Sequence, residues 1–308
     1  MLEIQFAPLQ GYTDAAYRRF HNEIYGNSIG CYFTPFIRVE KGAIRAKDLK
    51  DILPGNNENV PIVPQIIVNS VDEFNLLVDT IVALGYHRID INMGCPFPLQ
   101  VNRGRGAGLL HRIDVVNDLM VEVKKRQEVS FSIKMRLGLN DCNESVEISS
   151  IINNTPLSQV VIHPRIGRQQ YKGDVNIEAF ERLYNEIAHP IIYNGDLLGV
   201  EDVNNIVSRF PRLAGVMIGR GLLATPSLAM EYNQGVCLTE GQRLSLFITL
   251  HEKLFNYYKD ILQGDAQLLM KMKSMWDYQE SIIGHKVLKS IKKSTTIAKY
   301  QAAVSAIQ

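Results

Sequence analysis

The residues best suited to chemistry lie in the segment Asn92-Met93-Gly94-Cys95-Pro96. The segment closes an apolar run that predicts a buried strand, and Pro96 cannot continue a hydrogen-bonded ladder. We therefore expect the strand to end here and to display the Cys95 thiol rather than pack it. A thiol with a pKa of about 8.5 is mostly protonated at neutral pH and can act as a general acid. The alternative is an inert thiol, the commoner state of a cysteine in a globular protein.

Other polar residues lie within or directly after further apolar runs. Lys134 lies inside the run 131–137, so its ammonium group is predicted to point into the protein and not toward water. Two short segments, Asn-Gly-Asp at 194–196 and Gly-Arg-Gly at 219–221, follow later runs. Segments of this kind, placed after the last strands of a barrel, bind phosphate through loop amides and a helix N-terminus.

These residues are positioned by a repeating pattern of short apolar runs and amphipathic stretches. The spacing within 71–82 and 113–123 is typical of helices with one buried face. Apolar strands that alternate with such helices predict a parallel sheet covered by helices. The eight runs cover residues 4–9, 32–39, 61–68, 88–93, 131–137, 159–163, 190–193 and 215–218.

Eight such units favour a closed (β/α)8 TIM barrel, an α/β fold, over an open doubly wound sheet, which usually has fewer strands. The segment 219–224, Gly-x-Gly-x-x-Ala, imitates a dinucleotide-binding fingerprint. That fingerprint opens a first β-α unit, whereas here it would close the eighth. A Rossmann fold is therefore disfavoured.

The strand pattern stops after Cys237, and long helical periodicity follows. We predict a TIM-barrel domain over residues 1–237 and a small helical domain over residues 238–308. From Thr239 onward ten Lys and Arg oppose six Asp and Glu, a net charge of +4, whereas the rest of the chain carries −3. Such asymmetry indicates a basic module of the kind that contacts phosphate backbones.

Within that basic module, four lysines lie at spacings that place several of them on one face of a helix. They could form a stripe that contacts phosphates, or they could simply be a solvated helix surface. The four are Lys286, Lys289, Lys292 and Lys293.

Composition excludes several classes of protein. With 46% hydrophobic and 21% charged residues, the 308-residue chain lies in the ordinary globular range. No apolar run approaches the roughly 20 residues of a membrane-spanning helix, and the N-terminus lacks the pattern of a signal peptide, so a cytoplasmic location away from membranes is expected. The four cysteines are far apart, which predicts reduced thiols, and the histidines are too scattered for a metal site. A monomer is the default expectation.

Asn-x-Gly-Cys-Pro followed by a glycine-rich loop resembles the dihydrouridine synthase family of tRNA-modifying enzymes, which use flavin mononucleotide (FMN). The opening segment 7–14, Ala-Pro-Leu-Gln-Gly-Tyr-Thr-Asp, is similar to the family's Ala-Pro-Met-x-Gly-x-Thr-Asp, with Leu9 in place of methionine. The resemblance covers nearly the whole chain. Further matches follow in family order at successive strand ends: Gln65, Lys134-x-Arg136, His163-x-Arg165, Asn194-Gly195-Asp196 and Gly219-Arg220.

The resemblance implies FMN as cofactor, NADPH as its reductant and tRNA as partner. It makes residues 1–237 an FMN-binding TIM-barrel catalytic domain and residues 238–308 a helical tRNA-binding domain. It implies that hydride reaches C6 of a uracil ring from the flavin while Cys95, the catalytic residue, protonates C5. The target uridine must leave its stack, which favours a loop nucleotide. The implied cofactor-binding residues are Ala7, Pro8, Leu9, Gln65, Lys134, His163, Asn194, Gly195, Asp196, Gly219 and Arg220. The implied substrate-binding residues are Asn92, Arg136, His163 and Arg165, with residues 168–172 as further candidates for contact with the RNA backbone.

One motif departs from the family pattern, and two other functions compete with the implied one. The family commonly has His-Gly-Arg-Thr where this chain has His163-Pro164-Arg165-Ile166, so the backbone after the sixth strand is expected to differ. The first rival is an FMN-dependent barrel oxidoreductase that acts on a free pyrimidine or another small molecule, and it would not need a basic helical appendage. The second is an RNA-binding protein with little catalysis, which would not need Cys95, Lys134 and the phosphate loops together.

Overall fold

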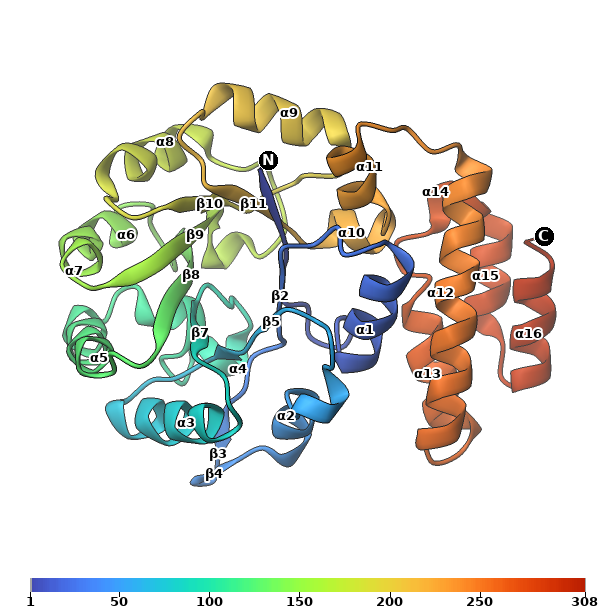
Figure 1. Cartoon of the computed structure of the whole chain (residues 1–308), viewed down its shortest axis with the longest axis horizontal. Coiled ribbons are helices and arrows are strands. Elements are labelled where there is room, and N and C mark those ends of the chain that lie inside the picture. Colours follow the sequence, from blue (N-terminus) through green and yellow to red (C-terminus); the bar gives the residue numbers. More distant parts are fainter. Residues whose placement is uncertain (1, 308) are drawn as a thin grey trace.

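A computed structural model of the chain describes residues 2–307, and its parallel strands form a barrel wrapped by helices (Figure 1). All eight apolar runs contain strands, so the predicted TIM barrel is confirmed. Within the described residues the strands of the barrel are β1 (Glu3–Phe6), β2 (Cys31–Phe33), β5 (Ile62–Val63), β6 (Gln65–Ile66), β7 (Arg88–Met93), β8 (Ser130–Gly138), β9 (Leu157–Ile166), β10 (Ile191–Tyr193) and β11 (Gly215–Ile218).

The barrel closes through Pro64, which separates β5 from β6. The strand β5 pairs with β2, whereas β6 pairs with β7 on the other side. Proline has no N–H for a ladder and interrupts the strand. Its carbonyl oxygen nevertheless accepts a hydrogen bond from the Asp90 N–H (2.9 Å), so the two halves act as one strand that joins both edges of the sheet.

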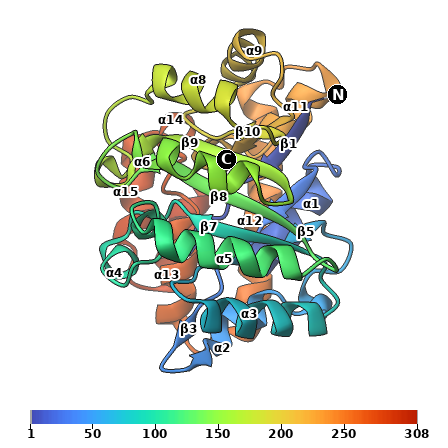
Figure 2. The ribbon, with the colours of Figure 1, turned by 90° about the vertical axis from the view of Figure 1, so that its left-hand side faces the viewer.

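Helices cover the outside of the barrel because each buries one apolar stripe against the strands (Figure 2). In α3 this stripe consists of Phe74, Leu77, Val78 and Ile81, and the Ser70 hydroxyl caps the helix by accepting from the Glu73 N–H. The covering helices are α1 (Ala15–Ile24), α3 (Val71–Ala83), α5 (Ile113–Lys125), α7 (Ser149–Asn153), α8 (Ile177–Glu186), α9 (Val200–Arg209) and α11 (Leu228–Gln234).

Shorter elements lie in the loops between strands and helices. They are β3 (Val39–Glu40), β4 (Ala43–Ile44), α2 (Ala46–Asp51), η1 (Pro54–Asn56), α4 (Pro98–Val101), η2 (Gly106–Leu109), α6 (Glu144–Glu147), η3 (Gly167–Gln169) and α10 (Arg220–Ala224).

Alternation along the strands decides which side chains enter the barrel. In β8, Ile133 and Met135 join the large apolar core under the helices, so Lys134 between them points into the barrel, as predicted from the run 131–137. The apolar part of the interior is a small separate cluster of Ala7, Cys31, Phe33, Val63, Val161, Ile192 and Met217. The remainder is polar, including a buried pair in which Gln5 Nε2 donates to Gln159 Oε1 (2.8 Å).

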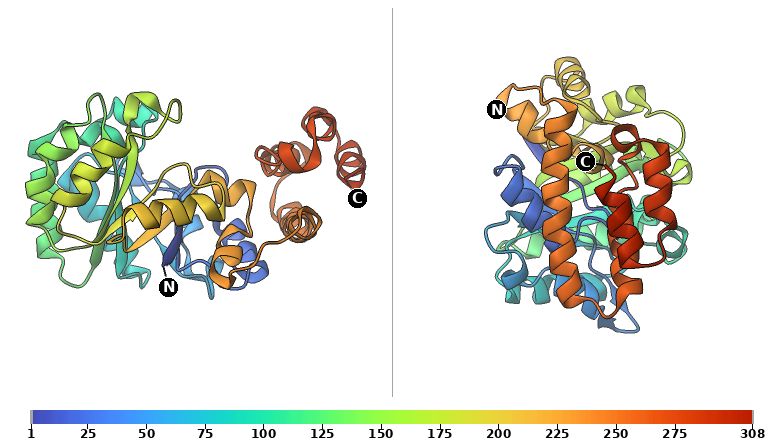
Figure 3. Two further views of the ribbon diagram at one scale, coloured as in Figure 1. Left: turned by 90° about the horizontal axis from the view of Figure 1, so that it is seen from above. Right: turned by 90° about the vertical axis from the view of Figure 1, so that its right-hand side faces the viewer.

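Up to residue 307, the end of the described chain, five helices follow the last barrel helix and form a bundle on one flank (Figure 3). Thr239 caps the first of them, and Trp276 and Tyr300 are fully buried in the bundle core. His251 Nε2 and Trp276 Nε1–H both meet the Tyr300 hydroxyl, at 2.6 and 2.8 Å. The helices are α12 (Glu240–Ile261), α13 (Asp265–Ser274), α14 (Glu280–Ile283), α15 (His285–Lys293) and α16 (Ile297–Ser305). None of the helices between residues 2 and 307 has the length and apolarity needed to cross a membrane.

The opening motif of the chain attaches this bundle to the barrel. The Asp14 carboxylate caps α1 and also accepts from the Tyr258 hydroxyl (2.6 Å) and from Lys271 Nζ (2.8 Å). Tyr12 donates its hydroxyl to Asp277 (2.7 Å). Tyr12 and Asp14 of the motif therefore have a structural role that the sequence pattern did not reveal.

Candidate active site

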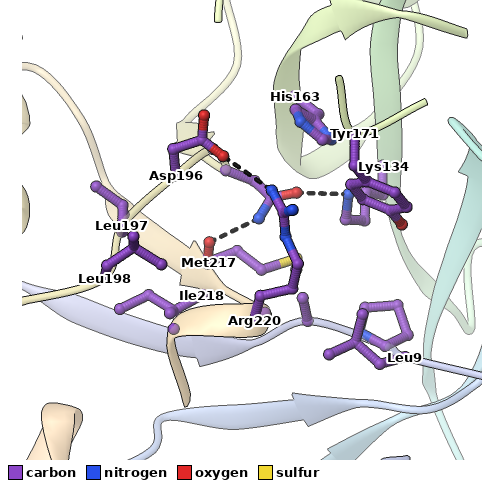
Figure 4. Close-up of a pocket in the computed structure, with 16 residues that line it drawn as sticks. Leu9, Lys134, His163, Tyr171, Asp196, Leu197, Leu198, Met217, Ile218 and Arg220 are labelled. Atoms are coloured by element: carbon purple, nitrogen blue, oxygen red, sulfur yellow. Dashed lines mark hydrogen bonds and ion pairs between the residues drawn. The ribbon is translucent and has the colours of Figure 1, made fainter. Parts of the chain in front are cut away.

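A pocket opens at the carboxyl ends of the strands, where the loops after β1, β9, β10 and β11 meet. Figure 4 shows Arg220 extending across it, with Leu197 and Leu198 on one side and Lys134 and Tyr171 on the other. Ten of the eleven residues implied to bind the cofactor line this pocket: Ala7, Pro8, Leu9, Lys134, His163, Asn194, Gly195, Asp196, Gly219 and Arg220. Of the other lining residues, Gly221 belongs to the predicted phosphate segment 219–221 and Tyr171 to the segment 168–172 named for RNA contact. No site role was predicted from the sequence for Leu197, Leu198, Met217 and Ile218.

Lys134 is held in the pocket wall by an amide. Its Nζ donates to Asn194 Oδ1 (2.7 Å), and Asn194 Nδ2 donates in turn to the Met217 carbonyl oxygen (2.8 Å). Burial, together with the neighbouring Arg136, lowers the pKa of Lys134 to about 8, although Asp90 and Cys95 act in the opposite direction. The lysine is therefore charged at neutral pH, and a nearby anion would raise its pKa and stabilise the charged form.

His163 is neutral in this site. Burial lowers the pKa of its ring well below the ordinary value, and the charges of Arg136, Lys134, Arg165 and Arg220 lower it further. Arg165 Nη1 lies 3.2 Å from His163 Nε2, and because a guanidinium can only donate, this nitrogen is the acceptor. The ring proton is consequently on Nδ1, which remains available as a donor.

Asp196 orients two arginines at the edge of the pocket. Its carboxylate pairs with both terminal nitrogens of Arg165 and with Arg220 Nη2 (2.9 Å). Arg165 also donates to the Gly173 carbonyl oxygen, at 2.7 Å from Nη2. With only 2% of its surface exposed, Arg165 holds the 167–176 loop against the barrel and does not reach the molecular surface.

Tyr171 lies at the tip of that loop and is half exposed. The Arg220 guanidinium carbon is 4.8 Å from the centre of the Tyr171 ring, and that of Arg136 is 5.4 Å away. The aromatic ring therefore lies between two cations beside the pocket, an arrangement stabilised by cation–π attraction. Pro164, the departure from the family pattern, falls where β8 and β9 change register, so its missing N–H costs no ladder bond.

The backbone of the Cys95 loop is held by hydrogen bonds to neighbouring side chains and to the backbone of the next loop. Asn92 Oδ1 accepts from the N–H groups of Gly94 (3.1 Å) and Cys95 (2.8 Å), and the Cys95 carbonyl oxygen accepts from the Ala107 N–H (3.0 Å). Arg136 Nε donates to the Gly94 carbonyl oxygen (3.0 Å). Burial raises the pKa of the Cys95 thiol, so the thiol is protonated at neutral pH.

The glycine-rich loop that follows presses against Cys95. Gly106 has a φ of +59°, and a β-carbon there would lie 2.6 Å from the Cys95 carbonyl oxygen, closer than packing allows. Arg105 secures the loop by pairing with both oxygens of Glu73 and donating to the Val39 carbonyl oxygen (2.9 Å). The glycines of this loop therefore serve to hold the cysteine.

Gln65, the one implied cofactor residue outside the pocket lining, is fully buried. Its Nε2 donates to Asp90 Oδ2 and its Oε1 accepts from Asn92 Nδ2, both at 2.7 Å. Arg136 is likewise buried, with Nη1 donating to the Ile166 carbonyl oxygen (3.0 Å). The structure brings Gln65, Asn92, Arg136 and Cys95 together beside Lys134.

Comparisons with known proteins agree with this geometry. Residues 5–307 match the family described as "Dihydrouridine synthase (Dus)". The chain is 28% identical over 235 residues to a human "tRNA-dihydrouridine(20a/20b) synthase [NAD(P)+]-like" protein, covering 74% of this chain and 71% of that one. It is 26% identical over 239 residues to a "tRNA-dihydrouridine(16) synthase" of Cupriavidus necator, covering 75% and 73%. The fold is similar to that of the old yellow enzyme from Trypanosoma cruzi, with a TM-score of 0.54 at 13% identity over 77% of this chain and 89% of that one.

Proposed function

The chain belongs to the dihydrouridine synthase family, and on that premise we propose that it is a flavin-dependent oxidoreductase that reduces the C5–C6 double bond of a uridine in tRNA. FMN is the proposed bound cofactor and NADPH the proposed reductant. The observation that carries the proposal is the placement of the Cys95 thiol, which Asn92 and the glycine-rich loop hold beside Lys134 and Arg136. The relatives named for tRNA dihydrouridine synthesis support the choice of substrate.

The residues around the pocket fit FMN in charge and in chemistry. Arg220, 34% exposed at its side chain, and the loop amides of Gly195 and Gly219 would hold the phosphate. Lys134 and the Nδ1–H of His163 would donate to polar atoms of the ring system. Leu9 and Met217 supply apolar surface for a flat ring.

In the proposed reaction, FMN when bound supplies a hydride to C6 of the uracil ring. Cys95 donates its proton to C5, so the ring gains two hydrogens and the cysteine is left as a thiolate. The charges of Arg136 and Lys134 oppose the effect of burial on the thiol pKa and stabilise this thiolate. A proton from solvent then restores the thiol for the next turnover.

The substrate must deliver a flipped base, since a stacked uridine could not reach a site inside a barrel. We propose that the barrel, residues 1–237, carries the catalytic site and that the helical bundle, residues 238–308, contacts tRNA. Lys286, Lys289 and Lys293 are exposed on α15, whereas Lys292 is paired with Asp277 and donates to the Lys273 carbonyl oxygen (2.8 Å). With tRNA as the proposed substrate, we propose a cytoplasmic location for the protein.

The direct test incubates the flavin-loaded protein and NADPH with tRNA that lacks dihydrouridine and maps any two-hydrogen gain in mass by nucleotide. We expect the gain at one loop position. Position mapping is needed because the names of the relatives specify different sites, 20a/20b and 16. If tRNA gains no mass while free pyrimidines or orotate drive NADPH consumption, the protein is a small-molecule reductase instead.

The proposed proton donor is tested by Cys95→Ala. We expect bound flavin to be retained and turnover to fall by about 10²-fold or more, the usual loss when a general acid is removed. Cys142→Ala, which removes another partly buried thiol, is the matched control and should retain activity. Full activity of Cys95→Ala would eliminate the proposed role.

A further inference from the structure

A continuous chain of side-chain hydrogen bonds runs through the barrel interior to the Cys95 loop. The Ser132 hydroxyl donates to Asp90 Oδ1 (2.6 Å), and Gln65 Nε2 donates to Asp90 Oδ2 (2.7 Å). Asn92 Nδ2 donates to Gln65 Oε1 (2.7 Å). The chain ends where Asn92 Oδ1 accepts from the Cys95 N–H.

The direction of every bond in this chain agrees with an acceptor at one end, the Asp90 carboxylate, and with donors at the other, the backbone N–H groups of the Cys95 loop. Ionised Asp90 can only accept, so Gln65 must turn its NH2 toward it and its oxygen toward Asn92. Asn92 must then turn its NH2 toward Gln65, which leaves its oxygen facing the backbone N–H groups of the Cys95 loop. The backbone N–H groups of the loop require the same orientation of Asn92, so Asp90 contributes the acceptor that Gln65 Nε2 needs at the far end of the chain.

A second polar pair in the barrel interior shows that uncharged side chains can satisfy one another there without a carboxylate. Gln5 and Gln159 form a buried pair in which each Nε2 donates to the other's oxygen, at 2.8 and 3.1 Å, and no charge is involved. Asp90, by contrast, is fully buried without a direct hydrogen bond to a cation. Burying a carboxylate is costly, so a function that needs its acceptor-only character is the simplest explanation.

We propose that Asp90 is a positioning residue that supplies the acceptor for Gln65, so that Gln65 holds Asn92 and thereby fixes the Cys95 loop for proton transfer. The inference rests on the proposed role of Cys95 as proton donor. Because Asn92 Oδ1 is already used by two backbone N–H groups, Asn92 offers a bound base only an N–H. The group it can recognise is therefore a carbonyl oxygen.

Two substitutions at Asp90 separate bond direction from charge. Asp90→Leu removes the acceptor and should free the loop, raising the alkylation rate of Cys95 by iodoacetamide and lowering kcat, each by about tenfold, the equivalent of one lost buried hydrogen bond. Asp90→Asn should stay within about threefold of wild type, because its oxygen can face Gln65 while its NH2 donates to the Ser132 hydroxyl oxygen.

A double variant tests the same logic by non-additivity. Ser132→Ala alone should be mild, since the carboxylate still orients Gln65. Asp90→Asn combined with Ser132→Ala leaves the introduced amide without a partner for its NH2 at position 132. We expect this double variant to resemble Asp90→Leu and to exceed the product of the two single effects.

The controls distinguish a positioning role from general destabilisation. Gln159→Leu breaks the separate Gln5–Gln159 pair in the same barrel and should leave Cys95 alkylation and kcat unchanged. Alkylation is followed by peptide mass spectrometry, which resolves Cys95 from Cys142 and Cys237, and bound flavin and the midpoint of thermal unfolding are recorded for each variant.

The outcomes are decisive in either direction. A wild-type alkylation rate in Asp90→Leu, equal effects of Asp90→Leu and Gln159→Leu, or an Asp90→Asn variant as impaired as Asp90→Leu would each overturn the proposal. The alkylation comparison needs no RNA. Absence of tRNA reduction by the wild type would therefore refute the proposed function while the positioning role of Asp90 is still decided.

Discussion

At the scale of single residues, the site combines a surplus of positive charge with a protonated thiol. Lys134, Arg136, Arg165 and Arg220 all depress the pKa of His163, which is therefore a neutral donor and not a fifth cation. Such a surplus suits a phosphate, a cofactor that accumulates negative charge, and the thiolate left after proton donation. The arginines also bond to groups within the protein, so their side chains are held in the walls of the site.

Lys134 should impose a pH dependence on cofactor reduction. Its ammonium group is charged below its lowered pKa of about 8 and neutral above it. We expect the rate of flavin reduction by NADPH to fall as pH rises, with an inflection at pH 8 or higher because a bound anion raises the pKa of the lysine. Lys134→Met should be slower by roughly tenfold below that pH, the value of a charge-assisted hydrogen bond, and should lack the inflection.

Rapid-mixing measurements of flavin bleaching across pH 6.5 to 10 would follow this step without RNA. Cys95→Ala serves as the control, since the thiol takes no part in cofactor reduction and its inflection should match that of the wild type. A flat wild-type profile would remove the proposed role of the Lys134 charge.

At the scale of elements, each loop after a strand end is supported by a neighbouring loop or strand. The η2 loop supports Cys95 through Gly106 and Ala107, and Arg105 joins that loop to Glu73 of α3 and to the Val39 carbonyl oxygen. Proton donation needs a fixed thiol, and a backbone-to-backbone contact provides one without side-chain freedom. The glycine pattern after Cys95 therefore supports the position of the proposed proton donor.

Gly106→Ala should displace Cys95. The substitution adds a β-carbon 2.6 Å from the Cys95 carbonyl oxygen at a φ of +59°, so the loop must shift. We expect kcat to fall by about tenfold or more, with bound flavin retained, since small displacements of a reacting group carry large costs in rate.

The matched control is Gly85→Ala. Gly85 also has a positive φ, +89°, but nothing lies within 4 Å of an added β-carbon. It should lose about 1 kcal/mol of stability from the left-handed backbone and keep its kcat. Equal kcat values for the two variants would show that the Gly106 contact does not position the thiol.

At the scale of the whole molecule, the helical bundle is fixed to the barrel through the first loop of the chain. Burial raises the pKa of Asp14, but Lys271 and Tyr258 outweigh it and hold that pKa below the ordinary value. The same loop contributes Ala7, Pro8 and Leu9 to the pocket, so one short segment links the proposed cofactor site to the bundle.

Asp14→Ala should destabilise the protein more than loss of a helix cap alone. It removes the cap of α1 and also the partners of Tyr258 and Lys271, which predicts a loss of about 2–4 kcal/mol in free energy of unfolding. Ser70→Ala, which removes only the cap of α3, should cost about 1 kcal/mol. Urea denaturation measures both, and equal losses would contradict the anchoring role.

The exposed lysines of α15 should affect tRNA binding through salt. Lys289→Glu with Lys293→Glu is expected to weaken tRNA affinity and to reduce the dependence of affinity on salt concentration by about one to two units of slope, without changing flavin content. Lys124→Glu with Lys125→Glu, on the barrel helix α5, is the control pair with the same change in net charge. An unaltered salt slope in the α15 variant would place the tRNA contacts elsewhere.

The sequence by itself determined the barrel and the place of Cys95. Eight apolar runs separated by amphipathic stretches are a local signal, because burial on both faces of a parallel strand and on one face of a helix is written in consecutive residues. The position of Lys134 inside the run 131–137 likewise predicted its direction, because side chains alternate along a strand.

Only the tertiary structure decided how the site residues are used. Asp14 meets Tyr258 across 244 positions, Lys134 meets Asn194 across 60, and Arg136 donates to carbonyl oxygens at Gly94 and Ile166. A backbone carbonyl has the same chemistry at every residue, so a sequence pattern cannot indicate which one an arginine will contact. Distant partners and backbone acceptors therefore become visible only once the chain has folded, and they decide that Arg165 supports a loop, that Lys292 is paired and that Asp90 faces Gln65.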